Sequence, residues 1–119
     1  MAIERKAVRL LIIEDSQNEA ERIVSLFRNS GLPTRVHRSS DPEALTKALV
    51  NPWDLCIASS DCKQLPPLTA LRILQKTGRD LSFIQLVAEQ DSNLIVEALQ
   101  QGAQAAVPKG EDEHLMLVV

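Results

Sequence analysis

The sequence predicts an α/β protein built on an open, doubly wound parallel sheet of five strands, with helices on both faces. Three observations favour this fold class. Five short apolar runs alternate with five helical patterns along the chain. The first run is nearly continuous and rich in β-branched residues, which is typical of a parallel strand covered on both sides. The length of 119 residues suits one domain and is too short for an eight-unit barrel.

The first unit and the strand that follows it lie in the N-terminal third of the chain. Val8 to Ile13 is apolar except for Arg9, so we expect a buried strand. The next segment places four apolar residues at helical spacing: Ala20, Ile23, Val24 and Phe27. Gly31 is suited to end that helix. Thr34 to Arg38 is short and basic, which predicts an edge strand protected by its charges.

A second helix and the third unit follow. Residues 40–43 (Ser-Asp-Pro-Glu) combine a capping residue, a first-turn proline and an acid, which predicts a helix start. The apolar face of that helix comprises Ala44, Leu45, Ala48 and Leu49. Leu55 to Ala58 is the third predicted strand, and a polar loop follows it. A third helix, ending near Gly78, is predicted from Leu68, Leu71, Ile73 and Leu74.

The last two units are shorter. Phe83 to Ala88 predicts the fourth strand, and Asp91 or Ser92 is expected to cap the next helix. The core face of that helix is expected to comprise Ile95, Ala98 and Leu99. Ala105 to Val107 predicts a small fifth strand, and Glu111 to Val119 begins a fifth helix. Because that helix lacks several residues of its usual length, we expect the chain to be the N-terminal part of a multidomain protein.

Composition and charge exclude several kinds of partner. The net charge is −3, whereas a dedicated DNA- or RNA-binding protein is expected to carry a positively charged surface. No apolar run is long enough to span a bilayer, and no signal-peptide pattern is present. Cys56 and Cys62 are too few for a disulfide framework or a zinc site, which indicates a buried thiol and a loop thiol in a reducing compartment. We expect a cytoplasmic domain that neither binds nucleic acid nor inserts into a membrane.

In a doubly wound sheet, functional residues lie at the carboxyl ends of the strands. Glu14 and Asp15 follow the first strand, where two carboxylates can hold Mg²⁺. Alternatively, Asp15 and Ser16 simply cap the following helix. Lys109 follows the fifth strand and is expected to face the same crevice, although spacing alone favours a solvated surface lysine. Ser59 ends the third strand without a histidine or an oxyanion hole placed to activate it, so hydrolase chemistry is not expected. No glycine-rich phosphate loop is present, so we expect no cofactor and no small-molecule substrate.

Three segments resemble one known family. They are L-L-I-I-E-D-S-Q (residues 10–17), W-D-L-C-I-A-S (53–59) and G-A-Q-A-A-V-P-K (102–109). Over essentially its whole length, the chain resembles the receiver domain of bacterial response regulators. The resemblance implies a CheY-like, flavodoxin-like sheet of strand order 2-1-3-4-5. It also places the family's acidic pair at Glu14 and Asp15, and its lysine at Lys109.

The departures from this family pattern concern its phosphorylation switch. The phosphoacceptor aspartate falls at Ser59, the switch Thr or Ser at Val87, and the switch aromatic at Ala106. A serine hydroxyl cannot replace the nucleophilic carboxylate, and Val and Ala supply neither a hydroxyl nor a ring that responds to a phosphoryl group. Asp61, two residues beyond Ser59, would need a shifted loop to act as a substitute acceptor. The loss also leaves weak Mg²⁺ binding at most.

A second, narrower resemblance involves both ends of the chain. The segments R-L-L-I-I-E-D-S-Q-N-E-A-E-R (9–22) and H-L-M-L-V-V (114–119) resemble the receiver-like domain of FimX-type signalling proteins. Those proteins join such a domain to PAS, degenerate GGDEF and EAL domains. The resemblance therefore implies a role in cyclic-di-GMP signalling and twitching motility.

The last two helices carry more apolar residues than one core face needs. Candidates for contact with a protein partner or a second copy are Leu94, Val96, Leu115, Met116, Leu117 and Val118. Fraying at the end of the chain explains the terminal run equally well. In the family, the surface formed by the fourth helix, fifth strand and fifth helix often makes such contacts.

Three functions are compared on these residues. The leading hypothesis is a non-enzymatic, phosphorylation-independent interaction module of a signalling protein. The second is an active receiver that uses a non-standard acceptor with Mg²⁺. The third is a flavodoxin-like cofactor binder, which the acidic first loop and the scarcity of aromatic residues oppose.

Overall fold

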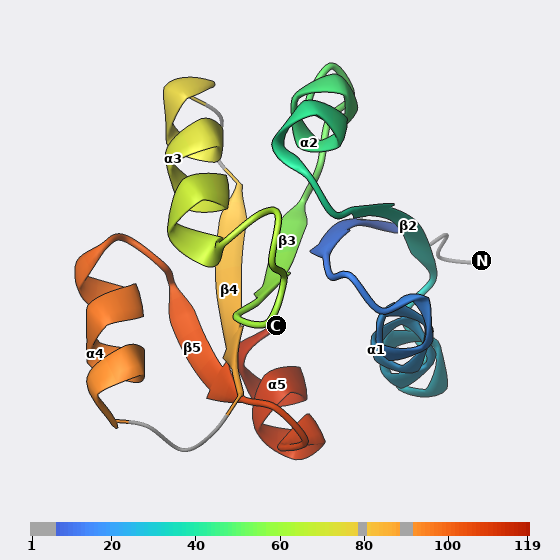
Figure 1. Ribbon diagram of the computed structural model, residues 1–119. Coiled ribbons are helices and arrows are strands. Elements are labelled where there is room, and N and C mark those ends of the chain that lie inside the picture. The colour runs from blue at the N-terminus through green and yellow to red at the C-terminus, as the bar shows by residue number, and fades with distance from the viewer. Residues whose placement is uncertain (1–6, 79–80, 89–91) are drawn as a thin grey trace.

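The computed structural model describes residues 7–78, 81–88 and 92–119, and its centre is a five-stranded sheet (Figure 1). The strands are β1 (Val8–Ile13), β2 (Thr34–Ser39), β3 (Leu55–Ser59), β4 (Ser82–Val87) and β5 (Ala105–Pro108). All neighbouring strands pair in parallel, in the order β2-β1-β3-β4-β5. The predicted fold class and strand order are therefore confirmed, and β2 is an edge strand as its basic sequence indicated.

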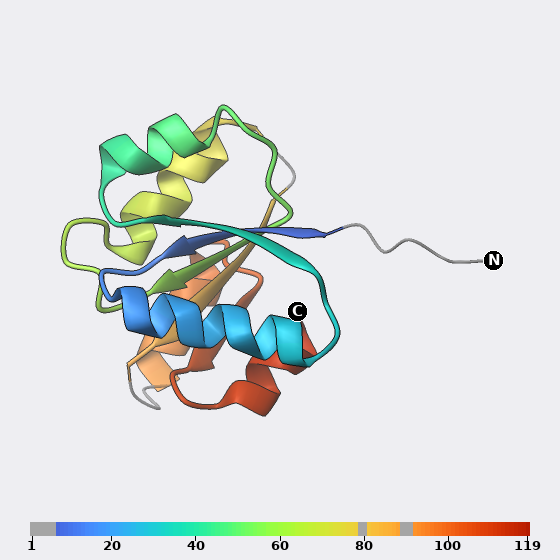
Figure 2. The same cartoon turned by 90° about the vertical axis from the view of Figure 1, so that its right-hand side faces the viewer.

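Five helices cover the two faces of this sheet. They are α1 (Gln17–Asn29), α2 (Pro42–Ala48), α3 (Pro67–Lys76), α4 (Ser92–Gln100) and α5 (Asp112–Val118). Figure 2 shows α1 and α5 on one side of the sheet and α2 and α3 on the other. Buried residues of α4 belong to the same core cluster as those of α2 and α3.

The alternation of side chains along β1 explains why the sheet needs two helical layers. Leu10 and Ile12 pack into the cluster beneath α1 and α5, whereas Leu11 and Ile13 pack into the cluster beneath α2, α3 and α4. Residues 10–13 of β1 are all apolar and their side chains point alternately to the two faces, so both faces of the sheet must be covered.

Polar caps fix the starts of the first two helices. The backbone N–H of Glu19 donates to Ser16 Oγ at 3.2 Å, so Ser16 is the N-cap of α1. The N–H of Ala44 donates to Asp41 Oδ1 at 2.8 Å, which confirms the predicted helix start at residues 40–43. Asp91, a predicted cap of α4, lies outside the described residues.

Two predictions about the faces of the C-terminal helices are wrong. Leu99 was expected in the core, but it is exposed on α4. Leu115 was expected at an interface, but it is only 2% exposed and packs in the core cluster beneath α1 and α5. In both helices nearly every position near the core is apolar, so composition does not fix which side turns inward. Within the described residues, no helix is long and apolar enough to cross a membrane.

Candidate functional site

The carboxyl ends of β1, β3 and β5 meet at an open crevice of about 650 Å³. Glu14 and Asp15 directly follow β1, Lys109 directly follows β5, and all three line this crevice. The structure therefore brings together the acidic pair and the lysine that the sequence singled out. Asp61, from the loop after β3, lines it as well.

Lys109 is the central cation of the crevice. Its Nζ lies 2.7 Å from Asp61 Oδ2 and 3.5 Å from Glu14 Oε2. Burial alone lowers the pKa of Lys109, but the two carboxylates outweigh it, so the pKa is raised above its ordinary value. The ammonium group is therefore charged and already paired by carboxylates of its own chain.

Glu14 is a carboxylate held almost out of solvent. It is 3% exposed, and its Oε1 accepts a hydrogen bond from the backbone N–H of Ser16 at 3.1 Å. Its Oε2 is buried and has no hydrogen-bond partner among the described residues. The ion pair with Lys109 is thus the interaction that compensates this oxygen, since an uncompensated buried charge is costly.

Asp15 points to a different set of partners. Its Oδ2 accepts from the backbone N–H of Lys63 at 3.0 Å, and its Oδ1 accepts from the thiol of Cys62 at 3.3 Å. The Lys63 N–H, followed by the Cys62 thiol, holds the pKa of Asp15 below its usual value. Asp15 therefore holds the loop after β3 by hydrogen bonds, while Glu14 forms an ion pair with Lys109. Across the described parts of the chain, no three His, Cys, Asp or Glu side chains are grouped to hold a metal ion.

Cys62 is the loop thiol that the sequence indicated, but it is buried. Burial, then the Asp15 carboxylate, raises the pKa of its thiol to about 11. The protonated sulfur can therefore donate to Asp15 at neutral pH.

Ser59 ends β3, two residues before Asp61, and is the residue that the sequence resemblance aligns with the acceptor of receiver domains. It is buried, and its Oγ accepts a hydrogen bond from the backbone N–H of Asp61 at 3.2 Å. Neither histidine serves it as a base: the His37 ring packs 5.9 Å from that of Trp53, and His114 Nδ1 lies 3.2 Å from Glu111 Oε2. The hydroxyl of Ser59 therefore shapes the turn that presents Asp61.

Val87 and Ala106 are the residues that the sequence resemblance aligns with the switch positions of receiver domains. Val87 ends β4, is fully buried, and accepts a hydrogen bond at its carbonyl oxygen from the Lys109 N–H at 2.7 Å. Ala106 is buried in β5 opposite Gln85. An isopropyl and a methyl group can neither bind a phosphoryl oxygen nor exchange between inward and outward rotamers as a ring does.

Asp61 has a role in the crevice that the sequence does not predict. The sequence indicates only that a shifted loop would be needed to bring it to the acceptor position, whereas in the structure its carboxylate is the nearer of the two partners of Lys109. The only sequence signal was an acidic residue two positions beyond a strand end. The loop conformation that makes it useful depends on contacts from Asp15 and Ser59.

The predicted contact surface is partly retained. Leu94 and Val96 on α4 are exposed, and so are Leu117 and Val118 on α5. Leu117 is the most exposed of them at 84%. Met116 is half-buried and packs against the core, so Met116 and Leu115 contribute to stability more than to an exposed surface. Leu99 joins the exposed apolar residues of α4.

Comparison with known proteins assigns the fold. No family profile and no curated protein matches the sequence. The structure is similar to the receiver domain of the Francisella response regulator 1452, with 23% identity, a TM-score of 0.78, and coverage of 92% of this chain and 91% of that chain. It is also similar to the signal receiver domain of an HD domain-containing protein from Pseudomonas fluorescens Pf-5, with 23% identity, a TM-score of 0.77, and coverage of 95% and 91%.

Chemotaxis protein CheY4 of Vibrio cholerae is a third similar structure. It is 17% identical, with a TM-score of 0.75 and coverage of 94% of this chain and 95% of that chain. At these identities the likeness establishes the fold. The chain therefore has the CheY-like receiver fold, and its function is inferred from its own residues.

Proposed function

We propose that this chain is a receiver-like regulatory module that acts through protein contact without being phosphorylated. The observation that carries the proposal is Ser59, which stands at the end of β3 where a receiver needs a carboxylate nucleophile. Its hydroxyl is buried and already accepts the Asp61 N–H, and both histidines contact other side chains.

The charge balance of the crevice supports the same conclusion. Lys109 pairs with Asp61 and Glu14, while Asp15 is engaged by Cys62 and Lys63. An incoming phosphoryl group would have to displace Asp61 from Lys109. Val87 has no hydroxyl to hydrogen-bond that group, and Ala106 has no ring that could change its rotamer in response.

A protein-contact function is supported by the surface at β5, the second edge strand of the sheet. The helices α4 and α5 both contact β5, and each exposes aliphatic side chains, namely Leu94, Val96, Leu99, Leu117 and Val118. Exposed apolar patches of this kind are typical of association sites. We propose that a second copy or a partner protein covers this surface.

The wider cellular role rests on the resemblance of residues 9–22 and 114–119 to FimX-type proteins. On that basis, we propose that the module belongs to a multidomain cytoplasmic protein and positions downstream domains of cyclic-di-GMP signalling in motility control. The module itself is proposed to be non-enzymatic.

A second function is favoured by one observation. Asp61 presents a half-exposed carboxylate next to Lys109, which is the environment of a phosphoacceptor. The rival is therefore an active receiver that phosphorylates Asp61 with Mg²⁺.

One experiment separates the two functions. The ¹⁵N-labelled protein is titrated with beryllofluoride and Mg²⁺, and separate samples are treated with acetyl phosphate and Mg²⁺ and weighed intact. The proposal expects no saturable shift in the amide spectrum and no phosphoryl adduct. An adduct that disappears in Asp61→Asn would establish the rival, and one that disappears in Ser59→Ala would place the acceptor at Ser59; either result overturns the proposal.

The contact surface is tested by light scattering of the protein and three variants. Val96→Glu and Leu117→Glu place a charge on the surface, whereas Val50→Glu places the same charge on another exposed valine, just beyond α2. If copies associate there, the first two variants lower the mass and the control does not. If the wild type is monomeric at every concentration, the occupant of this surface is a different protein.

A further inference from the structure

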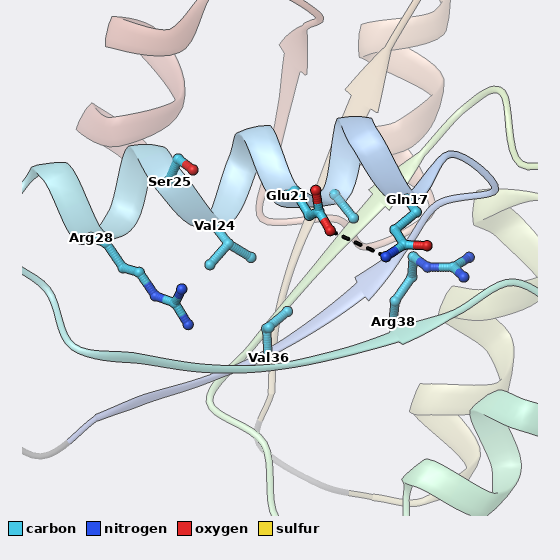
Figure 3. A pocket seen from close by; sticks show the side chains of 8 residues that line it. Gln17, Glu21, Val24, Ser25, Arg28, Val36 and Arg38 are labelled. Atoms are coloured by element: carbon cyan, nitrogen blue, oxygen red, sulfur yellow. Dashed lines mark hydrogen bonds between the residues drawn. The ribbon is translucent and has the colours of Figure 1, made fainter.

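A groove of about 610 Å³ runs between α1 and β2, and Figure 3 shows the side chains that line it. The strand β2 is the edge of the sheet opposite β5 (Figure 1). Its inner wall is apolar and comprises Ala20, Val24 and Val36. Val36 is 41% exposed, so α1 covers this edge of the sheet incompletely. The helix side also carries Arg28 and the strand side Arg38, which Figure 3 shows at the two ends of the groove.

The open edge of β2 offers backbone hydrogen bonds alongside this groove. Pro33 and Ser39 direct their carbonyl oxygens to β1, where the N–H groups of Val8 and Glu14 donate to them. Because the backbone alternates with a period of two, the N–H and C=O of Val36 point away from β1. No described strand pairs with that side of β2. Val36 therefore presents its side chain to the groove and its backbone to the open edge.

The edge strand β2 is basic although the chain as a whole is acidic. The chain as a whole carries −3, yet β2 reads T-R-V-H-R-S and contains no carboxylate. Arg28 and Arg35 form no ion pair with any residue in the described ranges. Arg38 Nη1 donates to the Glu14 carbonyl oxygen at 3.1 Å, which holds its guanidinium at the rim.

One carboxylate, Glu21, lines the groove beside the two arginines. It accepts a hydrogen bond from Gln17 Nε2 at 3.1 Å along α1, as the dashed line in Figure 3 shows. The edge thus combines a free strand, a small apolar wall and an excess of positive charge, because Arg28 and Arg38 outnumber Glu21 in the groove lining.

We propose that the groove between α1 and β2 docks an extended acidic segment of a partner protein, which adds to the sheet as a sixth strand beside β2. Backbone groups of the segment pair with those of Val36, an aliphatic side chain rests against Val36 and Val24, and carboxylates face Arg28 and Arg38. Strand addition of this kind takes its affinity from the backbone and its specificity from alternate side chains.

Two other occupants fit this edge less well. A second copy of β2 would bring its own arginines against these, and like charges on facing edges oppose pairing. A nucleic acid would use the arginines but would leave the strand edge and the apolar wall without partners. The proposal does not depend on whether Ser59 or Asp61 in the crevice is phosphorylated.

The test uses a blocked peptide of about nine residues with valine at its centre, glutamate two residues to either side and threonine at the other positions, so that one face of the added strand carries both the valine and the glutamates. The peptide is longer than β2, which spans six residues. It is titrated into the ¹⁵N-labelled protein. We expect saturable shifts confined to residues of β2 and α1, weakening when the salt concentration is raised. Saturation absent at millimolar peptide, or shifts centred on α4 and α5, would overturn the proposal.

Protein variants and control probes sharpen the result. Arg28→Glu is expected to weaken binding about fivefold or more, whereas Arg72→Glu, the same charge change on exposed α3, should change it less than about twofold. Val36→Pro removes the outward N–H together with the aliphatic side chain that lines the groove, and should weaken binding about tenfold; circular dichroism checks that it folds. Equal weakening by Arg28→Glu and Arg72→Glu, or equal binding of the same peptide with lysine in place of each glutamate, would overturn the proposal. So would tighter binding of a single-stranded DNA oligomer at the same residues.

Discussion

Replacing Lys109 by Met tests how much the crevice depends on its central cation. The substitution keeps the stem of the side chain and removes the charge that faces Glu14 Oε2 at 3.5 Å and Asp61 Oδ2 at 2.7 Å. Asp61 is 55% exposed, so the loss of its pair costs about 0–1 kcal/mol. Glu14 is buried, and removing one partner of a fully buried pair costs about 3–5 kcal/mol.

Two features of Glu14 reduce that cost. The carboxylate keeps its hydrogen bond from the Ser16 N–H, and the crevice is open to water on one side. We therefore expect Lys109→Met to lower the free energy of unfolding by about 2–3 kcal/mol. Asp61→Asn, which removes only the exposed partner's charge, should cost less than about 1 kcal/mol.

Urea unfolding followed by far-ultraviolet circular dichroism measures both variants, with equal m-values as the condition for comparing them. The double variant Lys109→Met with Glu14→Gln removes the stranded charge and should recover a part of the loss. The reasoning is refuted if Lys109→Met costs less than about 0.5 kcal/mol, or if Asp61→Asn costs as much as Lys109→Met.

Three further predictions concern other parts of the molecule. Leu115→Ala should cost about 2–4 kcal/mol in urea unfolding because it empties a core site, whereas the exposed Leu117→Ala should cost less than about 0.5 kcal/mol. Gly102→Ala should cost about 1–2 kcal/mol in the same assay, because its φ of 113° lies in the left-handed region and a Cβ would meet Gln75 Nε2 at 2.9 Å. Burial raises the pKa of the Cys62 thiol to about 11, so iodoacetamide should label it far more slowly at pH 8 in the folded protein than in urea, by mass spectrometry. Since that pKa lies above the unfolded value of 9.0, Cys62 stabilises the fold fully below pH 9.0, and this contribution is lost as the pH rises from there to about 11. Equal labelling rates in both states would contradict the burial of Cys62.

The fold could be predicted from the sequence because local and global signals agree. The apolar run Val8–Ile13 needs cover on both faces, and caps at Ser16 and Asp41 mark the helix starts. In a parallel sheet the strand order then decides which loops meet, so Glu14 and Lys109 could be expected in one crevice.

The remaining details depend on loop conformation and helix phase, which residue types do not fix. Asp61 reaches Lys109 only because Ser59 Oγ accepts its N–H and Asp15 holds the following backbone at Lys63. Successive residues of a helix differ by about 100° in direction. In the unbroken apolar run of α5, the packing beneath α1 selects Leu115 as the buried residue and leaves Leu117 exposed.

On the proposed function, the two surfaces must act without a phosphorylation-driven change in the core. A ligand shifts a conformational equilibrium only by its differential affinity for two states. Here the lysine that would sense a phosphoryl group is paired with Asp61, and Val87 and Ala106 supply no alternative arrangement that such a group would favour. Binding at the β2 edge or at β5 is therefore not coupled to a conformational equilibrium at the crevice. Each surface contributes affinity and geometry on its own, which suits a module that holds partners in fixed positions.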